Sequence, residues 1–501
     1  MEHSEVSSIN LLGILRYLAL PLALSLSMGL LVVYDSSLAS YHPLWQLTLD
    51  YMIAHNYLWT ATTLALLAII AISANYRGWL FNQRYRITII LLIATPALGG
   101  LNIFRLDPPD IALMIATIFW LISVLVEDRP VRVPRVVIAL LLGLVWFAVG
   151  AMMTNGAYVI LSLPSVLSKL MIMFLLANLI LTPRDLDMAL KTLVVVAVAS
   201  ACIAILAEGL YLLTGYAFTF DDRVDEHFKC FGWVCMFRAT GLTPTPQVLG
   251  HLLIMGIGLA LFLQVRTWIR LLIIIVMFVG AISTLSVGVG LTVIIVLALF
   301  PILRWPSRYP YILTAYASVV WLVHVTGFWA WAYRATNDLL LASYGANVRI
   351  WTYRGGAELI EKHPIFGIGA LKQIPGSMHF TTPHNAYLQI ALEMGLPAAC
   401  LFIALLIYLF ISCWSIAAQA QDTKTRHLMC GLLLGYLGML VHLLSEPFYT
   451  NNLPWAYMGL IAAGIIIYGR ASTDQEQTAI RQATPCVQRL ARTLQNAGHL
   501  S

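Results

Sequence analysis

One short segment late in the chain combines a histidine and an asparagine with a predicted helix start. In FTTPHNAYLQIALEMGLPAA, residues 380–399, Thr382 and Pro383 stand directly before His384 and Asn385. Threonine followed by proline is typical of a helix N-cap and first helical position, so we expect His384 in the first turn. A helix start attracts anions, and a histidine beside a bound anion can act as a general base. A histidine at a helix start is more often structural, so this hypothesis depends on its surroundings.

Arginines collect in two segments, residues 217–245 and 331–396. They are Arg223, Arg238, Arg334, Arg349 and Arg354. A guanidinium group stays charged and binds phosphate through two parallel hydrogen bonds. Thr245 and Pro246 repeat the N-cap signature a few residues after Arg238, which predicts a second helix start that favours an anion. These features predict a diphosphate site. The alternative for any single arginine is contact with lipid headgroups at the membrane surface.

Three other patterns carry weaker chemical signals. Cys230 and Cys235 share the segment DEHFKCFGWVCMFRATG and fit either a local disulfide or two free thiols. A zinc site would need further soft ligands, and only His227 lies nearby. The acidic pair of DLD, residues 185–187, resembles the metal-binding pair of sugar-nucleotide enzymes, but the neighbouring Arg184 favours a solvated helix start. We therefore predict no bound metal and no cofactor.

The composition places these residues in a membrane protein. Of 501 residues, 60% are hydrophobic and only 10% are charged, which excludes an ordinary soluble domain. The net charge of +6 lies mostly in short loops, so it predicts topology and not nucleic-acid binding. We expect an all-α fold of about 14 transmembrane helices. The predicted spans are 11–33, 52–74, 86–103, 110–126, 136–154, 165–181, 191–216, 246–265, 269–284, 287–303, 309–330, 397–417, 427–445 and 454–469.

The distribution of basic residues predicts which loops are cytoplasmic. They gather in alternate loops, at Arg77, Arg84 and Arg86; Arg129, Arg132 and Arg135; Arg184 and Lys191; Arg266 and Arg270; Arg304 and Arg308; and Lys424 and Arg426. By the positive-inside rule these loops and both termini face the cytoplasm. The loops at 34–51, 217–245 and 331–396 then face outward. The orientation after residue 303 depends on a helix break at STLSVGVG, residues 283–290.

The same pattern predicts the domain organisation. Residues 1–470 form one polytopic membrane domain, and the polar, basic residues 471–501 form a cytoplasmic tail. The external segments 217–245 and 331–396 are too long to be simple connectors, so we expect them to form the site. The second contains a predicted amphipathic helix over 347–362, followed by a turn with Pro364, Gly367 and Gly369.

Few ionisable residues fall within the predicted spans. Arg16 and Glu208 are the main examples. Transporters place charged side chains and repeated units at the middle of the membrane, and neither pattern is evident in this sequence. This observation argues against ion-coupled transport.

Two segments carry a resemblance to a known family. NVRIWTYRGGAELIEKHPIFGIGA, residues 347–370, and the His384 segment resemble the O-antigen ligase and polymerase superfamily of bacterial surface-glycan enzymes. The similarity is strongest over 346–399, with a second patch at FRATGLTPTPQVLG, residues 237–250. The resemblance implies a GT-C-type membrane glycosyltransferase. Such an enzyme takes its glycan from an undecaprenyl-diphosphate carrier and needs neither a nucleotide sugar nor a metal ion.

The resemblance also assigns roles to individual residues. The essential histidine of the family falls on His384, with Asn385 and Gly395 matching the rest of its motif. The diphosphate-binding arginines fall on Arg238 and Arg349. This sequence departs from the family in three places, of which one is Ala398 as the final small residue of the histidine motif. Tyr353 stands where tryptophan is commoner, with Trp351 nearby, and Ser286-Val287-Gly288 replaces a Ser-Arg-Gly that is frequent in relatives.

The sequence hypothesis is inverting glycan transfer at the outer face of the bacterial cytoplasmic membrane. His384 is the expected catalytic base, and Arg238, Arg349, Arg354, Asn385 and Tyr353 are the expected substrate-binding residues. The expected partners are the lipid-linked donor, membrane lipids, and lipid A–core or another lipid or glycan as acceptor, without nucleic acid. A ligase and a polymerase that uses a lipid-linked repeat as acceptor both fit, and a lipid-linked glycan flippase is the alternative of another class. The sugar, the linkage and the oligomeric state do not follow from the sequence.

Overall fold

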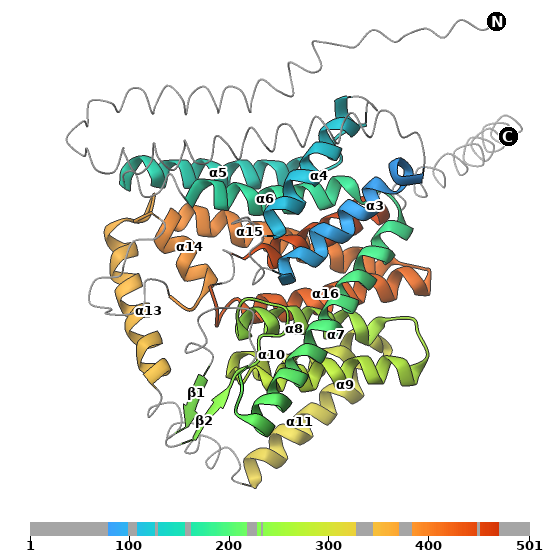
Figure 1. Cartoon of the computed structure of the whole chain (residues 1–501), viewed down its shortest axis with the longest axis vertical. Coiled ribbons are helices and arrows are strands. Elements are labelled where there is room, and N and C mark those ends of the chain that lie inside the picture. The colour runs from blue at the N-terminus through green and yellow to red at the C-terminus, as the bar shows by residue number, and fades with distance from the viewer. Residues whose placement is uncertain are drawn as a thin grey trace, which may run out of the picture. The chain divides into compact units, whose positions relative to one another are not determined.

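The computed structural model describes residues 79–98, 108–125, 129–155, 162–217, 228–231, 234–326, 344–369, 383–447 and 451–469. The chain divides into two compact units, residues 1–84 with 121–130 and residues 85–120 with 131–501. The candidate site residues described below all belong to the second unit. The described chain is helical apart from one hairpin, so the expected all-α class is confirmed (Figure 1).

Most helices coincide with predicted spans, but one ends at Ala94, well before the end of the span predicted at 86–103, and another begins at Pro183, before the predicted 191. The first helices of the described chain are α3 (Trp79–Ala94), α4 (Pro108–Leu125), α5 (Arg135–Asn155), α6 (Ser162–Leu179) and α7 (Pro183–Thr214), with the short η2 (Thr95–Leu98) after α3. After the hairpin come α8 (Pro246–Phe262), α9 (Thr267–Ser283), α10 (Val287–Arg304), η5 (Pro306–Arg308), α11 (Tyr309–Val325), α13 (Tyr344–Lys362), α14 (Ala386–Met394), α15 (Leu396–Gln419) and α16 (Thr423–His442). A further helix covers Asn452–Gly469.

The predicted number of about 14 membrane spans is not confirmed. Among the described residues, four helices are long and apolar enough to cross a membrane: Pro183–Thr214, Val287–Arg304, Leu396–Gln419 and Asn452–Gly469. Other predicted spans coincide with shorter apolar helices, and the spans predicted at 11–33 and 52–74 lie outside the described residues. The apolar helices and their number support a multi-pass membrane protein.

Side-chain caps explain where several helices begin. Thr245 is the N-cap of α8, and its hydroxyl accepts a hydrogen bond from Val248 N, with Pro246 in the first turn, as predicted. Thr182 caps α7 in the same way, accepting from Asp185 N and donating to the Asp185 carboxylate. The DLD segment is therefore the start of a helix, as predicted, but the Asp185 side chain is only 15% exposed and lies 3.4 Å from Arg86 Nε, so it is not the solvated residue that was expected.

The most deeply buried helix is α8, whose residues are almost all inaccessible to solvent. It packs against α16, α7, α9 and α10, which Figure 1 shows around it. Gly258 of α8 faces Gly435 of α16 so closely that a Cβ on Gly258 would lie 2.5 Å from the Gly435 Cα. Small residues allow such close approach of apolar helices. This contact joins α8, which follows Arg238, to α16.

The break predicted at residues 283–290 is present. Helix α9 ends at Ser283, and Ser286 caps α10 by accepting from Val289 N. Leu285 between them has a φ of 49°, in the left-handed region that L-residues seldom adopt. The 269–303 stretch is therefore two helices, as the topology prediction requires.

A two-stranded antiparallel hairpin precedes α8. It consists of β1 (Phe228–Phe231) and β2 (Val234–Phe237), and its register pairs Cys230 with Cys235. The side chains of these cysteines lie outside what the structure describes, so the disulfide stays a prediction.

Candidate functional site

His384 lies immediately before α14, not inside its first turn. Asn385 is the N-cap: its Oδ1 accepts from Leu388 N at 2.9 Å, and its Nδ2 donates to Leu444 O at 3.1 Å. The expectation that Thr382 and Pro383 begin the helix is therefore wrong. Asparagine is among the strongest N-cap residues, and with Asn385 in this role the helix begins at Ala386. Both polar ends of the Asn385 side chain are thus used within the protein.

Glu446 is the central residue of the site, and sequence reasoning missed it. Its Oε2 lies 3.3 Å from His384 Nδ1, and its Oε1 lies 3.3 Å from Arg349 Nη2. The Glu446 side chain is only 6% exposed, whereas the side chains of His384 and Arg349 are 25% and 40% exposed. One buried carboxylate therefore holds two side chains that reach an accessible surface. A single acidic residue just after the apolar stretch 427–445 was the signal that the sequence offered.

Helix α13 supplies two residues of the site from one face. Tyr353 lies one turn after Arg349, and its hydroxyl donates to the His384 backbone oxygen at 2.8 Å. Burial raises the pKa of Tyr353, which favours the protonated hydroxyl that this hydrogen bond requires. Tyr353 therefore contacts the histidine itself.

Arg354 stands apart from this cluster. It is exposed and makes no hydrogen bond or ion pair with another described residue. Trp351, on the same helix, is 71% exposed. The structure thus brings Arg349 and Tyr353 to His384 but does not bring Arg354 there. Arg223 and Arg334 lie outside the described residues.

The Pro364–Gly369 turn fastens the end of α13 to the end of α14. Ile368 N donates to Leu392 O at 2.8 Å, and Gly369 N donates to Glu393 O at 3.0 Å. These bonds satisfy carbonyl groups that the last turn of a helix leaves unpaired. In the reverse direction, Leu396 N donates to Pro364 O at 2.8 Å. We call this set of backbone bonds the α13–α14 clip.

Two glycines make the clip sterically possible. Gly367 has a φ of 64°, and a Cβ there would lie 2.4 Å from Leu392 O. Gly395 has a φ of 90°, and a Cβ there would lie 2.0 Å from Ile365 O. Both positions combine a left-handed backbone with close backbone contact, so only glycine fits. The two segments that resemble a known family are therefore joined in space and set Arg349 relative to His384.

Arg238 approaches the same cluster from the segment between β2 and α8. Its Nε donates to Thr284 O at 3.0 Å. Burial lowers the pKa of Arg238, the Glu446 carboxylate raises it, and the Arg349 guanidinium lowers it. Arg238 is thus within electrostatic range of both residues. The turn between α9 and α10, which lacks an arginine, contributes a carbonyl group that orients Arg238.

A second polar group lies at the other end of α14. Glu393 is 6% exposed and accepts a hydrogen bond from Gln389 Nε2 at 2.7 Å. The Lys169 ammonium from α6 acts electrostatically on Glu393 and on Asp110. Burial raises the pKa of Glu393 to about 7, and its hydrogen bond and Lys169 lower it in part. Burial thus outweighs the attraction of Lys169, so the protonated form of Glu393 is favoured in the folded protein.

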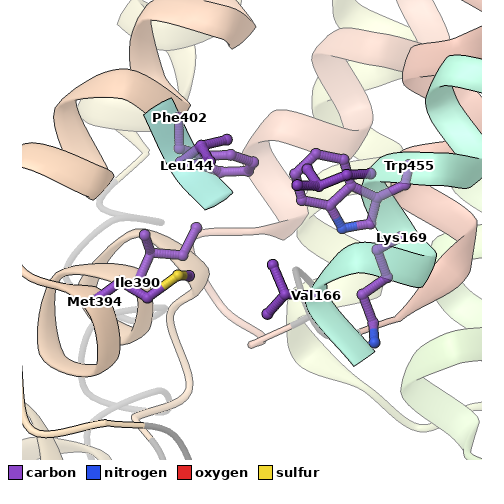
Figure 2. Close-up of a pocket in the computed structure, with 8 residues that line it drawn as sticks. Leu144, Val166, Lys169, Ile390, Met394, Phe402 and Trp455 are labelled. Atoms are coloured by element: carbon purple, nitrogen blue, oxygen red, sulfur yellow. The ribbon is translucent and has the colours of Figure 1, made fainter. Parts of the chain in front are cut away.

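An apolar hollow lies beside Lys169 (Figure 2). It is lined by Leu144, Val166, Lys169, Leu170, Ile390, Met394, Phe402 and Trp455. Figure 2 shows the Lys169 nitrogen directed away from Leu144 and Phe402, so the lysine contributes its aliphatic stem. The hollow lies beside α14, and its lining offers no polar group for chemistry.

Within the described ranges, no group of three or more histidine, cysteine, aspartate or glutamate side chains is placed to hold a metal ion. The predicted metal independence is not tested by this finding. The arrangement that the structure does show is a histidine, a buried carboxylate and two guanidinium groups.

Comparison with known proteins supports the resemblance found in the sequence. Residues 249–403 match the family model described as O-antigen ligase, which supports membership of the O-antigen ligase and polymerase superfamily. The matched region contains α13, the clip and His384, whereas Arg238 and Glu446 lie on either side of it. No curated protein matches the chain.

Proposed function

Starting from the similarity of residues 249–403 to the O-antigen ligase family, we propose that this protein is a metal-independent, inverting glycosyltransferase that uses an undecaprenyl-diphosphate-linked glycan. The family match supports lipid-linked glycan transfer of the ligase or polymerase class. The proposal adds the residues, the direction of transfer and the acceptor group. Transfer takes place at the outer face of the cytoplasmic membrane, to a hydroxyl of lipid A–core or of another lipid or glycan.

The observation that carries the proposal is the position of Glu446 between His384 and Arg349. His384 takes the proton from the acceptor hydroxyl, and the resulting imidazolium is stabilised by the buried carboxylate at 3.3 Å. The hydroxyl oxygen forms a bond to the anomeric carbon of the donor as the bond to the diphosphate breaks. Undecaprenyl diphosphate leaves with the bonding electrons, and the configuration at the anomeric carbon inverts.

Arg238 and Arg349 bind the diphosphate in this proposal. Both lie within electrostatic range of Glu446, and Arg349 is 40% exposed, so its guanidinium has room to bind a ligand. Two fixed positive charges stabilise the negative charge that develops on the leaving group. Asn385 and Tyr353 act by holding the backbone around His384, because their side chains donate hydrogen bonds to the backbone oxygens of Leu444 and His384. Arg354 is exposed and binds the glycan or a lipid headgroup outside this cluster.

The direct test is replacement of His384 by alanine in the purified full-length protein. His384→Ala should abolish glycan transfer while the protein elutes and melts like the wild type, because the base is lost without loss of core packing. The matched control is His363→Ala, since His363 is an exposed histidine at the end of α13. Transfer by His384→Ala at the rate of His363→Ala would refute the assignment of the base.

A second experiment separates ligase, polymerase and flippase. It compares the lipid-linked glycans that accumulate in cells without this protein and in cells that carry His384→Ala. Long chains retained on the carrier indicate a ligase, and single repeats indicate a polymerase. Accumulation at the cytoplasmic face would indicate a flippase and would overturn the proposed transfer reaction.

A further inference from the structure

Two histidines form a hydrogen-bonded pair in the helical core, outside the cluster around Glu446. His251 of α8 and His442, the last residue of α16, are 1% and 0% exposed. Their Nδ1 atoms lie 2.9 Å apart. Since a hydrogen bond needs one donor and one acceptor, the neutral rings take opposite tautomers at Nδ1. The pair joins α8 to the end of α16.

The histidine pair is polar, whereas most of the buried residues around it are apolar. The residues of α8 and of the inner face of α16 are otherwise mostly apolar or glycine. Burying a polar group costs free energy unless it is hydrogen-bonded, so two apolar side chains would pack here at lower cost. Polar residues retained inside an apolar helical bundle commonly serve the function of the protein.

The segment that follows His442 contacts the start of α14 and ends at Glu446 of the site. Ser445 N and Ser445 Oγ both donate to His442 O at 3.0 Å, which folds the chain into a tight turn. Within this turn Leu443 O accepts from Ala386 N at 2.9 Å, and Leu444 O accepts from Asn385 Nδ2 at 3.1 Å. The turn therefore receives the start of α14 and leads directly to Glu446. We call residues 443–446 the floor turn.

His251, the other member of the pair, lies on α8, the helix that follows Arg238 in the chain. Helix α8 begins at Pro246, soon after Arg238, and Gly250 next to His251 packs against Val289 of α10. Helix α10 in turn places Gly288 against the floor turn, since a Cβ there would lie 2.7 Å from Ser445 Oγ. The pair thus lies where the elements that carry Arg238 and Glu446 meet.

We propose that His251 and His442 are positioning residues for glycan transfer, whose mutual hydrogen bond holds the floor turn and thereby sets the Glu446 carboxylate against His384 and Arg349. The proposal rests on the proposed function, because it acts through the same site. A merely structural pair would affect the amount of folded protein alone. A positioning pair affects the rate per folded molecule, and the effect is smaller when the Glu446 carboxylate is absent.

The test is a double-mutant cycle between the pair and Glu446 in the full-length protein. His251→Leu/His442→Leu replaces both partners by apolar side chains, which is nearly neutral for stability. In the wild-type background this double variant should lower kcat roughly 10- to 100-fold, because a displacement near 1 Å has this effect on rate. The KM for a synthetic polyprenyl-diphosphate-linked donor should change much less. In a Glu446→Gln background, the same replacement should lower kcat by a clearly smaller factor, because the carboxylate that the pair positions is absent while the floor turn still contacts Asn385.

Two further variants complete the experiment. His442→Asn places an amide nitrogen or oxygen near the position of the imidazole Nδ1, so it should restore most of the lost kcat. Tyr436→Phe is the control, because it removes another buried hydrogen bond of α16, from Tyr436 Oη to Leu406 O, away from the floor turn. It should leave kcat unchanged.

The outcomes are distinguishable. A loss of kcat that is as large in the Glu446→Gln background as in the wild-type background overturns the positioning role. A folded leucine pair with normal kcat also overturns it. If the leucine pair does not fold, the single variant His442→Leu replaces it in the cycle, and the same two outcomes overturn the positioning role. Failure of the proposed function itself would appear separately, as normal transfer by His384→Ala.

Discussion

Replacement of Glu446 by glutamine removes one negative charge from the site while keeping the shape of the side chain. The amide can still hydrogen-bond to His384 and Arg349, but it no longer balances the charge that His384 gains when it accepts a proton. At the observed 3.3 Å, a full charge pair is worth about 5 kcal/mol with an effective dielectric constant of about 20. The retained hydrogen bond and the 25% exposure of the His384 side chain reduce this value.

A more realistic magnitude is that of one charge-assisted hydrogen bond, about 1.5–3 kcal/mol. Because about 1.4 kcal/mol corresponds to a tenfold change in rate, Glu446→Gln should lower kcat roughly 10- to 150-fold. The assay measures kcat and KM with a lipid-linked glycan donor and purified protein in lipid nanodiscs. The KM for the donor should rise as well, because a neutral amide orients Arg349 less strongly than the carboxylate does.

The matched control is Glu358→Gln, an equal change at an exposed position of α13. It should leave both kinetic constants unchanged. The reasoning is refuted if Glu446→Gln is folded and its kcat stays within a factor of about two of the control. In that case the carboxylate does not stabilise the protonated base.

Three further predictions concern the surroundings of the site. Gly395→Ala should lower the melting temperature, because the φ of 90° and the contact with Ile365 O leave no room for a Cβ. The control Gly209→Ala, with open space around the residue, should not lower it. Equal melting curves for the two variants would contradict the role of the clip. Tyr353→Phe loses the hydrogen bond to His384 O, worth about 1 kcal/mol, so kcat should fall roughly fivefold without a change in folding, and an unchanged kcat would argue against it. Burial raises the pKa of Glu393 to about 7 from 4.5, so its stabilising contribution is complete below pH 4.5 and is lost as the pH rises through 7. Glu393→Gln should therefore flatten the dependence of thermal stability on pH in this window, and a wild-type slope in the variant would contradict it.

Local features of the sequence predicted much of the fold. The helix start at Thr245 and Pro246, and the break after Ser283, depend on side chains within four residues of the backbone groups that they cap. The glycines at 367 and 369 predicted a turn because glycine readily adopts the positive φ that both residues show. The start of α14 was misplaced, although the deciding residue, Asn385, was only three positions from the predicted cap. Two capping signals three residues apart compete there, and the stronger N-cap residue, Asn385, sets the start of the helix.

The candidate site was only partly predictable. His384, Arg349 and Arg238 came from residue type and from resemblance to a family, and the structure places them in mutual range. Glu446 was missed because it is 62 residues from His384 and 97 from Arg349 in the chain. No periodicity or spacing connects residues so distant.

The sequence by itself thus determined the helical class, the main helix limits and the types of residue available for chemistry, because apolar length, capping and charge act locally along the chain. Only the tertiary structure decided which of these residues meet. The close glycine contact of α8 with α16, the α13–α14 clip and the floor turn bring Arg238, Arg349, His384 and Glu446 together. These contacts arise from the packing of distant helices, and the buried carboxylate at their centre is defined by that packing.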